Sequence, residues 1–228
     1  MTTTPDLWHH YGRARHTSDR AVPGHFAWTW SQQGGPGPEV LGDLAGRTVG
    51  DLGAGAARHA AHLAAHHSPA RIDAIDASPA QHQMANDLYS HLAPRLRIVH
   101  ADVLEHLHTA PGTYEVLYSV FGAVDFTDPR QLLPAAFAAL RPGGRLVFST
   151  LAHYLTGEPA QPYVQPAHIP ARTPDGEKTT MRRWVLEEPV WGKLLDQNGF
   201  TRVTTDHLPG EDGPRPAATL LVTAHRAW

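Results

Sequence analysis

The chain has 228 residues, of which 41% are hydrophobic, and its formal net charge is −3. A chain of this length suits one domain with at most a modest insertion, because single cores stop growing above roughly 250–300 residues. No long basic run is present, which disfavours nucleic acid as a partner. The absence of cysteine excludes disulfides and thiolate metal sites.

The N-terminal region lacks the features of a signal peptide. Charged residues occur throughout the first 20 positions, and no apolar segment follows them. No stretch of the chain approaches the roughly 20 apolar residues that a membrane-spanning helix needs. We therefore expect a cytoplasmic protein with no membrane partner.

Short apolar runs alternate with helical patterns from residue 47 onward. Before them, residues 1–46 form a polar and aromatic segment in which a short helix is predicted over 5–16, ahead of a Gly/Pro run at 34–38. Strands are then predicted at 48–52, 72–75, 96–100, 115–120 and 145–150, and helices at 56–66, 79–92, 104–108 and 129–140. Such alternation predicts an α/β fold with a mostly parallel sheet covered on both faces, joined by right-handed crossovers.

The alternation of strand and helix patterns ends at residues 151–187, where five prolines predict irregular structure. A loop of this length is usually functional or disordered. After it, a helix at 190–197 precedes strands at 201–206 and 219–224, which we predict to form an antiparallel edge of the sheet. The predicted organisation is an N-terminal acceptor segment (1–46), a binding core (47–150), a lid insertion (151–187) and a C-terminal completion of the sheet (188–228).

The strongest local signal lies at the end of the first predicted strand, where Asp51 precedes Gly53 and Gly55. Glycine allows positive φ and close approach of a ligand, and ligands of open α/β sheets bind outside the carboxyl ends of the strands. A turn that merely needs glycine is the simpler interpretation. A dinucleotide site fits poorly, because Arg58 stands at the third glycine position and Asp51 would repel a pyrophosphate. An acid here suits a cationic group such as an ammonium.

Two further acids follow the second and third predicted strands. Asp76 is suited to accept hydrogen bonds from ribose hydroxyls, and it is not needed as a helix cap because Ser78 and Pro79 fill that role. Asp102 either accepts a hydrogen bond from an exocyclic amine or is an ordinary turn aspartate. Three acids at three successive strand ends are harder to explain as ordinary turn residues than any one of them.

With these motifs, the sequence resembles the class I S-adenosylmethionine-dependent methyltransferases. The matching segments are Asp-Leu-Gly-Ala-Gly at 51–55, Ile-Asp-Ala-Ser-Pro at 75–79, His-Ala-Asp-Val at 100–103 and Leu-Arg-Pro-Gly-Gly-Arg-Leu at 140–146. The resemblance implies a Rossmann-like, doubly wound, seven-stranded sheet with an antiparallel final strand. It covers residues 40–150 well and 188–228 loosely.

The resemblance also implies which residues hold S-adenosyl-L-methionine. Asp51 would help to hold the ammonium, Asp76 the ribose hydroxyls, and Asp102 the adenine edge, while the glycines approach the methionine part. The complete expected set is Asp51, Gly53, Gly55, Asp76, Ala77, Asp102, Val103 and Ser119.

The end of the fourth predicted strand bears on the methyl acceptor. Methyltransferases that act on base amines of nucleic acids often carry Asn/Asp-Pro-Pro-aromatic there, whereas this chain reads Ser-Val-Phe-Gly at 119–122. The sequence is similar to the small-molecule and natural-product branch, with an N or O atom as acceptor. An RNA or protein methyltransferase and a non-catalytic cofactor-binding protein remain alternatives.

Aromatic and basic side chains are candidates for the walls of an acceptor pocket. They belong to residues 1–46 and 151–187, which we expect to form a lid that excludes water; the alternative is that they cover edges of the core. The candidates are Trp8, Tyr11, Phe26, Trp28, Trp30, Tyr154, Tyr163, Arg182, Arg183 and Trp184.

A general base is needed only when the acceptor is protonated. The candidates are His153, Tyr11 and His16, with His153 preferred because it follows the fifth predicted strand. An amine acceptor needs no base. A further series, His59, His62 and His66, lies on one helical face; we expect it to face solvent and predict no metal site.

Overall fold

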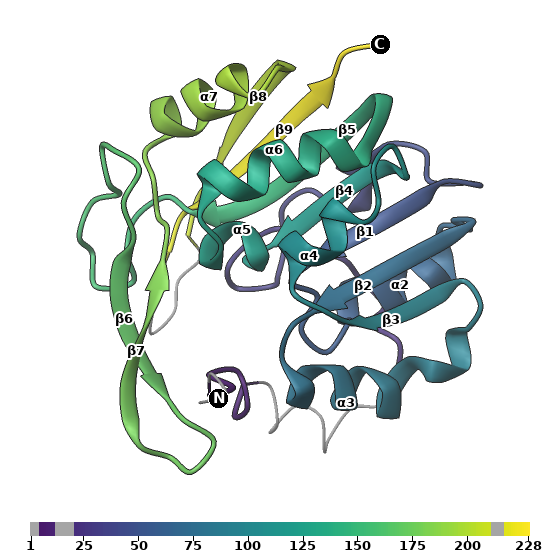
Figure 1. Ribbon diagram of the computed structural model, residues 1–228, viewed down its shortest axis with the longest axis horizontal. Helices are drawn as coiled ribbons and strands as arrows, with labels where there is room; N and C mark the ends of the chain where they lie inside the picture. Colours follow the sequence, from purple (N-terminus) through teal and green to yellow (C-terminus); the bar gives the residue numbers. More distant parts are fainter. Residues whose placement is uncertain (1–4, 12–20, 211–216) are drawn as a thin grey trace.

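A seven-stranded sheet forms the centre of the protein in the computed structural model, which describes residues 5–11, 21–210 and 217–228 (Figure 1). The strand order is β3-β2-β1-β4-β5-β9-β8, and β9 runs antiparallel to both of its neighbours. The strands are β1 Thr48–Leu52, β2 Arg71–Asp76, β3 Leu96–His100, β4 Tyr114–Val120, β5 Leu140–Leu151, β8 Phe200–Leu208 and β9 Thr219–Arg226. The expected α/β fold, with its single reversed strand, is confirmed.

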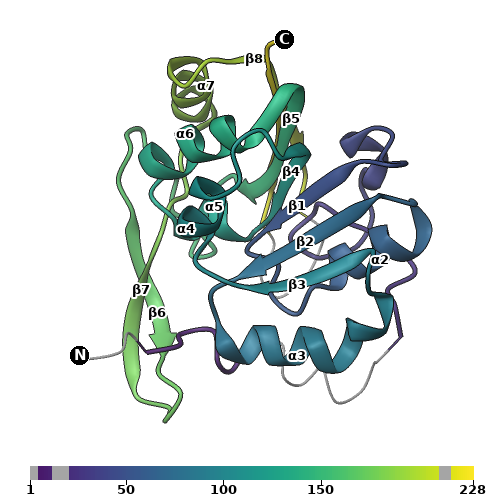
Figure 2. The same ribbon diagram turned by 45° about the vertical axis from the view of Figure 1, so that its right-hand side comes forward.

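Helices cover both faces of this sheet (Figure 2). The helices α2 and α3 pack against one face, and α4, α6 and α7 pack against the other. Their bounds are α2 Arg58–His66, α3 Pro79–Tyr89, α4 Val103–His108, α5 Ala123–Phe126, α6 Pro129–Ala139 and α7 Glu188–Gln197, with 3-10 turns η1 Pro38–Leu41 and η2 Ser90–Leu92. No helix among the described residues is long and apolar enough to cross a membrane.

The start of α3 shows how local sequence fixes an element. Ser78 accepts a hydrogen bond from the Gln81 N–H at 3.1 Å, and Pro79 occupies the first helical position. Proline costs nothing there because its missing N–H would have no partner within the helix. The predicted cap is confirmed, and it fixes the position of the turn that carries Asp76.

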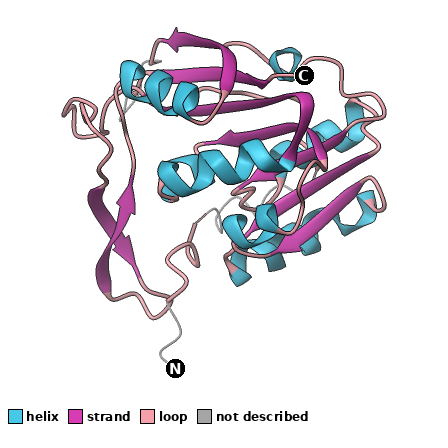
Figure 3. Cartoon of the chain, turned by 45° about the horizontal axis from the view of Figure 1, so that its top comes forward, coloured by secondary structure: helices cyan, strands magenta, loops and turns pink. Residues whose placement is uncertain are grey.

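Two predicted segments differ in the structure. Residues 5–11 form turns instead of the start of a helix. The stretch 151–187, predicted to be irregular, contains an antiparallel hairpin of β6 Ala167–Arg172 and β7 Lys178–Arg183 that stands apart from the main sheet (Figure 3). Proline did not prevent it, because Pro170 lies in a two-stranded ribbon, and proline is tolerated in strands that have an open edge.

The last two strands form the predicted antiparallel edge of the sheet, in which β8 is outermost and β9 is an interior strand. Between β5 and β8, β9 buries Leu220, Leu221 and Val222, so that β8 forms the edge of the sheet. Three consecutive buried apolar residues are typical of a strand that is covered on both faces.

Of the histidine series of α2, His66 is exposed as expected, whereas His59 is half-buried and His62 is buried. Phe26 lies over this helix, with its ring centroid 4.7 Å from that of His59, and His62 Nδ1 lies 2.7 Å from the Pro23 carbonyl oxygen. Burial lowers the pKa of His59 to about 4. These rings therefore pack the N-terminal segment onto α2. No cluster of His, Cys, Asp or Glu within the described residues is arranged to hold a metal ion.

Candidate active site

The loop after β1 touches the loop after β4 through backbone atoms. Gly53 has φ +78°, and a Cβ at this position would lie 2.3 Å from the Ala123 nitrogen. A Cβ on Gly122 would lie 2.5 Å from the Leu52 carbonyl oxygen. Two glycines are thus required where the carboxyl ends of two neighbouring strands meet. Sequence reasoning missed Gly122, although a glycine two residues after the fourth predicted strand was a signal for it.

The second glycine of the loop after β1 is open and aligned with Asp76. Gly55 has φ +53°, and the nearest atom to a Cβ there would be Gln81 Oε1 at 3.6 Å. Its N–H donates to Asp76 Oδ2 at 2.8 Å, while the Ser78 N–H donates to Asp76 Oδ1 at 2.9 Å. Burial raises the pKa of Asp76, and these two hydrogen bonds partly oppose the shift. Each carboxylate oxygen keeps lone pairs for another donor.

Asp51 is a buried carboxylate with one neutral hydrogen-bond donor. The Tyr118 hydroxyl donates to Asp51 Oδ2 at 2.8 Å, and no ion pair to Asp51 is formed by the part of the chain that the structure describes. Burial raises the pKa of Asp51 to about 7, and the Tyr118 hydrogen bond opposes that rise. A buried acid in this state favours a cationic ligand group. Tyr118 was not predicted as a site residue.

These features test which cofactor the site fits. An uncompensated carboxylate at the first loop suits an ammonium, and an acid fixed by two backbone N–H groups at the second strand end suits ribose hydroxyls. A pyrophosphate at the same loop would be repelled by the Asp51 carboxylate, even though backbone N–H groups are also present there. The residues present fit S-adenosylmethionine, and contact of Asp51 and Asp76 with that cofactor stays a prediction.

The third strand end holds the predicted adenine residues. Asp102 Oδ1 caps α4 by accepting from the Leu104 N–H at 2.8 Å, so this acid has a structural role of its own. Val103 is buried beside it. In the turn after β2, the Ala77 carbonyl oxygen lies 3.2 Å from His100 Nε2. Contact of these residues with adenine stays a prediction.

The Ser119 side chain connects the end of β1 to the start of α5. It is fully buried, and its hydroxyl donates to the Leu52 carbonyl oxygen at 2.8 Å. The Val124 N–H lies 3.4 Å from the same hydroxyl. The side chain therefore holds the first loop against α5, and its contact with the methionine part of the cofactor stays a prediction.

The N-terminal turn lies between α3, α5 and the hairpin (Figure 2). Asp6 Oδ2 accepts from the Ser78 hydroxyl at 2.9 Å, and Gln81 Nε2 donates to the Trp8 carbonyl oxygen at 2.9 Å. The Trp8 ring packs edge-on against Phe126, with centroids 4.6 Å apart. These contacts place Trp8 beside the loops that hold the cofactor residues.

The β6–β7 hairpin is joined to the same region by a buried ion pair. Arg183 Nη2 lies 2.6 Å from Asp125 Oδ2, and both side chains are almost completely buried. The Arg183 guanidinium also lies 5.3 Å from the ring centroids of Trp30 and Phe126. Planar guanidinium groups stack favourably on aromatic faces. One arginine thus connects the hairpin, α5 and the N-terminal segment.

Several predicted wall residues belong to the core instead. Phe26, Trp28 and Trp184 are at most 5% exposed and pack within the hydrophobic clusters of the sheet. Tyr163 is 56% exposed. Phe26, Trp28 and Trp184 therefore match the alternative expectation, that these aromatic residues cover the core. The aromatic side chains left at the site are Trp8, Trp30, Phe121 and Phe126.

The candidate bases differ in their surroundings. His153 Nδ1 lies 3.0 Å from the Tyr154 carbonyl oxygen, and its Nε2 accepts from the Ala218 N–H at 3.4 Å. Tyr11 is 61% exposed and packs edge-on against Trp8. His16 lies outside the described residues. All three remain predictions, and His153 must exchange one backbone contact before its ring can accept a proton.

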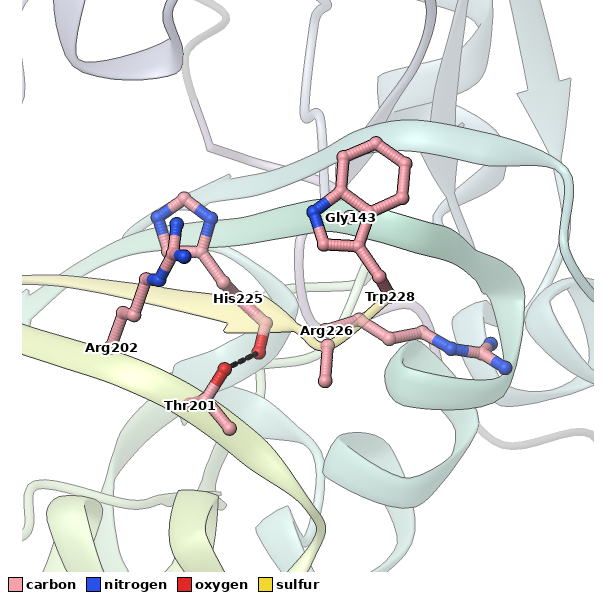
Figure 4. Close-up of a pocket in the computed structure, with 7 residues that line it drawn as sticks. Gly143, Thr201, Arg202, His225, Arg226 and Trp228 are labelled. Carbon is pink, nitrogen blue, oxygen red and sulfur yellow. Dashed lines mark hydrogen bonds between the residues drawn. The ribbon is translucent and has the colours of Figure 1, made fainter.

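A separate hollow of about 130 Å³ lies at the opposite end of the sheet (Figure 4). Gly143, Thr201 and Trp228 line it, at the amino end of the parallel strands. It contains no residue of the expected cofactor set. Ligands of open α/β sheets bind at the carboxyl ends, so this hollow is not part of the candidate active site.

Comparison with known proteins agrees with this geometry. Residues 49–144 match the family model of a methyltransferase domain, and no curated protein matches the chain. The fold is similar to an S-adenosylmethionine-dependent methyltransferase from Mesorhizobium loti, with TM-score 0.58, 22% identity, and coverage of 82% of this chain and 94% of that one. It is also similar to the 1,6-didemethyltoxoflavin-N1-methyltransferase of Burkholderia thailandensis, with TM-score 0.53, 20% identity, and coverage of 81% and 72%. A third similar structure is the phosphoethanolamine N-methyltransferase 2 of Haemonchus contortus, with TM-score 0.61, 11% identity, and coverage of 83% and 51%.

The segment that matches the methyltransferase-domain model extends from β1 to the start of β5. The expected enzyme class is therefore confirmed. The site geometry, together with this domain and fold, supports S-adenosylmethionine as the cofactor.

Proposed function

We propose that the protein transfers a methyl group from S-adenosylmethionine to an N or O atom of a small molecule, in natural-product biosynthesis in the cytoplasm. The observation that carries this proposal is the arrangement of Trp8, Phe126, Arg183 and Trp30 beside the cofactor loops. In this arrangement, the described parts of residues 1–46, together with residues 151–187, supply the acceptor walls. Residues 47–150 and 188–228 supply the sheet.

The cofactor residues act by position and charge. When bound, S-adenosylmethionine supplies a methyl group on a positively charged sulfur. Asp51 attracts the ammonium of the methionine part, and Asp76 orients the ribose. The Gly53–Gly122 contact fixes the relative position of the two loops. Because alignment of the reacting atoms supplies up to roughly 7–11 kcal/mol of a reaction barrier, a rigid loop pair is the main catalytic requirement.

The acceptor walls exclude water from the reacting atoms. Trp8 covers Phe126 from the N-terminal side, and Arg183 covers it from the hairpin side. Removing water strengthens electrostatic interactions within the site and prevents hydrolysis of reactive groups. The partly buried aromatic faces of Trp8, Trp30 and Phe126 suit a planar, largely apolar acceptor.

A small-molecule acceptor is favoured over RNA. The net charge of −3 provides no surplus of cations to neutralise a phosphate backbone. The Burkholderia protein with the same fold is named for methylating N1 of 1,6-didemethyltoxoflavin, a small molecule bound in its structure. RNA or protein methylation and cofactor binding without catalysis are the alternatives that an assay must separate.

The direct test is transfer of a radiolabelled methyl group to three pools: small metabolites, peptides and RNA. We expect label only in the small-molecule fraction. Label in RNA or peptide would replace the proposed acceptor class, and absence of label in all three pools, with S-adenosylhomocysteine bound, would favour a non-catalytic binder.

Trp8→Ala tests the acceptor walls against a matched variant, Trp228→Ala. Trp228 is 95% exposed at the opposite end of the sheet. We expect Trp8→Ala to lower kcat at least about tenfold by admitting water and loosening the acceptor, with S-adenosylhomocysteine affinity changed less than about threefold. Trp228→Ala should leave both unchanged. Equal loss of turnover and cofactor binding in Trp8→Ala would contradict the wall role.

A further inference from the structure

A groove of about 610 Å³ lies outside the candidate active site, on the face of the sheet that carries α4. The α4 helix has only six residues and leaves part of β2 and β3 uncovered. Polar and basic side chains line the groove at its base. The lining residues used below are Arg71, Asp73, Arg97, Val99, His106, Ala110 and Tyr114.

Asp73 is the centre of the polar network in this groove. Its side chain is fully buried in the middle of β2. Arg97 Nε and Nη2 donate to its two oxygens at 2.8 Å each, and the Tyr114 hydroxyl donates to Oδ2 at 2.8 Å. A buried carboxylate needs a cationic partner and hydrogen bonds, and Arg97 with Tyr114 supplies both. Asp73 is therefore satisfied without a second arginine.

A second arginine is nevertheless present. Arg71 Nε lies 3.0 Å from Asp73 Oδ1, but this nitrogen forms no hydrogen bond with any described residue. The Arg71 side chain is 38% exposed, and that of Arg97 is 51% exposed. Two guanidinium groups and one carboxylate leave a net charge of about +1 in a concave site. The Arg71 guanidinium has donors available to a ligand.

His106 extends the network along α4. Its Nε2 lies 2.6 Å from the Tyr114 hydroxyl oxygen. Because the Tyr114 hydrogen is donated to Asp73, Nε2 of His106 must be the donor in this contact. Nε2 can donate in both the neutral and the protonated ring, and burial lowers the pKa of His106. An anion in the groove would favour the protonated ring.

We propose that this groove binds a small oxyanion, with Arg71 and Arg97 as its cationic contacts. Carboxylate and phosphate groups each present a pair of oxygens that can accept two parallel hydrogen bonds from one guanidinium group. Val99 and Ala110 supply an apolar wall for the body of an organic anion. The site is independent of the proposed methyl transfer, because none of its residues belongs to the cofactor set.

The test uses the full chain and two probes, inorganic phosphate and benzoate, at constant ionic strength set with chloride. Nuclear magnetic resonance of the histidine rings should show a saturable shift of His106 for at least one probe. A shift with phosphate alone assigns the ligand to phosphate compounds, and a shift with benzoate assigns it to carboxylates. No saturable shift with either probe would overturn the proposal.

Arg71→Gln is the informative variant, because it leaves the Arg97–Asp73–Tyr114 contacts in place. We expect probe affinity to fall at least fivefold in Arg71→Gln, with S-adenosylhomocysteine affinity unchanged. Arg130→Gln is the control, since Arg130 is an exposed arginine that pairs with Asp128 at the start of α6; it should bind the probe within twofold of the wild type. Unchanged probe affinity in Arg71→Gln would contradict the assignment.

Discussion

The Tyr118 hydroxyl donates to Asp51 across 2.8 Å, from β4 to the neighbouring strand β1. The two residues are paired in register, although 67 positions separate them in the chain. This bond is the strongest influence that opposes the rise in the Asp51 pKa caused by burial. Burial and this hydrogen bond together set the pH range in which the first loop carries the negative charge that the proposed cofactor needs.

Cofactor binding should depend on pH through Asp51. Its pKa of about 7 means that the carboxylate is charged above this pH and increasingly protonated below it. The attraction for an ammonium is lost with the charge, so S-adenosylhomocysteine affinity should fall by up to about tenfold per pH unit below 7. Calorimetric titrations between pH 5.5 and pH 8.5 measure this. A flat profile would show that Asp51 does not contact the ammonium.

Tyr118→Phe should move this pH profile. Losing the hydroxyl removes a hydrogen bond that stabilises the charged carboxylate, so the pKa of Asp51 should rise above about 7. The fall in S-adenosylhomocysteine affinity should then begin at higher pH, while affinity at pH 9 stays close to that of the wild type. A uniform loss of affinity at every pH would instead indicate a packing defect beside Trp28.

Asp51→Asn should stabilise the fold at alkaline pH while weakening cofactor binding. The folded pKa of about 7 exceeds the ordinary 3.8, so stability is lost as pH rises between these values. This loss amounts to about 4 kcal/mol in the wild type, and Asp51→Asn avoids it. The buried amide N–H of the new asparagine has no acceptor, which costs about 1–3 kcal/mol. We expect a net gain of about 1–3 kcal/mol at pH 8.

Urea unfolding at pH 8 and pH 5 measures this gain in free energy of unfolding. The gain should shrink at pH 5, where the wild-type carboxyl is largely neutral. Asp196→Asn, on the exposed side of α7, is the control and should change little at either pH. Destabilisation by Asp51→Asn at pH 8 would contradict the claim that Asp51 carries a buried charge without a cationic partner.

Gly53→Ala should separate the cost of a clash from the cost of a positive φ. Gly53 has φ +78° and backbone atoms at 2.3 Å, whereas Gly46 has φ +70° and nothing within 4 Å of a Cβ. Gly46→Ala should cost about 1–2 kcal/mol of stability from backbone conformation alone. Gly53→Ala should cost at least about 2 kcal/mol more because the loops must separate, and it should abolish S-adenosylhomocysteine binding. Equal costs would show that the Gly53–Gly122 contact is not required.

The buried ion pair should hold the hairpin in place. Arg183→Met leaves Asp125 charged and without its partner, so we expect a loss of about 3–5 kcal/mol in urea unfolding. Adding Asp125→Asn should recover most of this loss, because the lone charge is removed. Arg182→Met, at the adjacent exposed position on β7, is the control and should cost less than about 1 kcal/mol.

The sequence predicts the sheet well because strand and helix periodicities are local. The strand-end acids and glycines were predicted for the same reason, since each lies directly after an apolar run. The Asp51–Tyr118 bond and the Gly53–Gly122 contact were not predicted, because they depend on which strands are neighbours and in what register.

Other features were hidden by composition or by long-range packing. The proline-rich stretch concealed the β6–β7 hairpin, whose open edges tolerate Pro170. The aromatic residues near the N-terminus look alike in the sequence but have different surroundings in the structure. Trp28 is fully buried, whereas Trp8 lies against Phe126 at the candidate site. Only the packing of the N-terminal segment on α2 distinguishes them.

The central claim is that the loop after β1, with Asp51 and Asp76, binds an adenosyl sulfonium cofactor. A calorimetric titration of S-adenosylhomocysteine into the purified chain at pH 8 tests it most directly. We predict saturable binding of one molecule per chain, lost in Asp76→Ala. Absence of binding heat, with a nicotinamide dinucleotide binding in its place, would contradict the account.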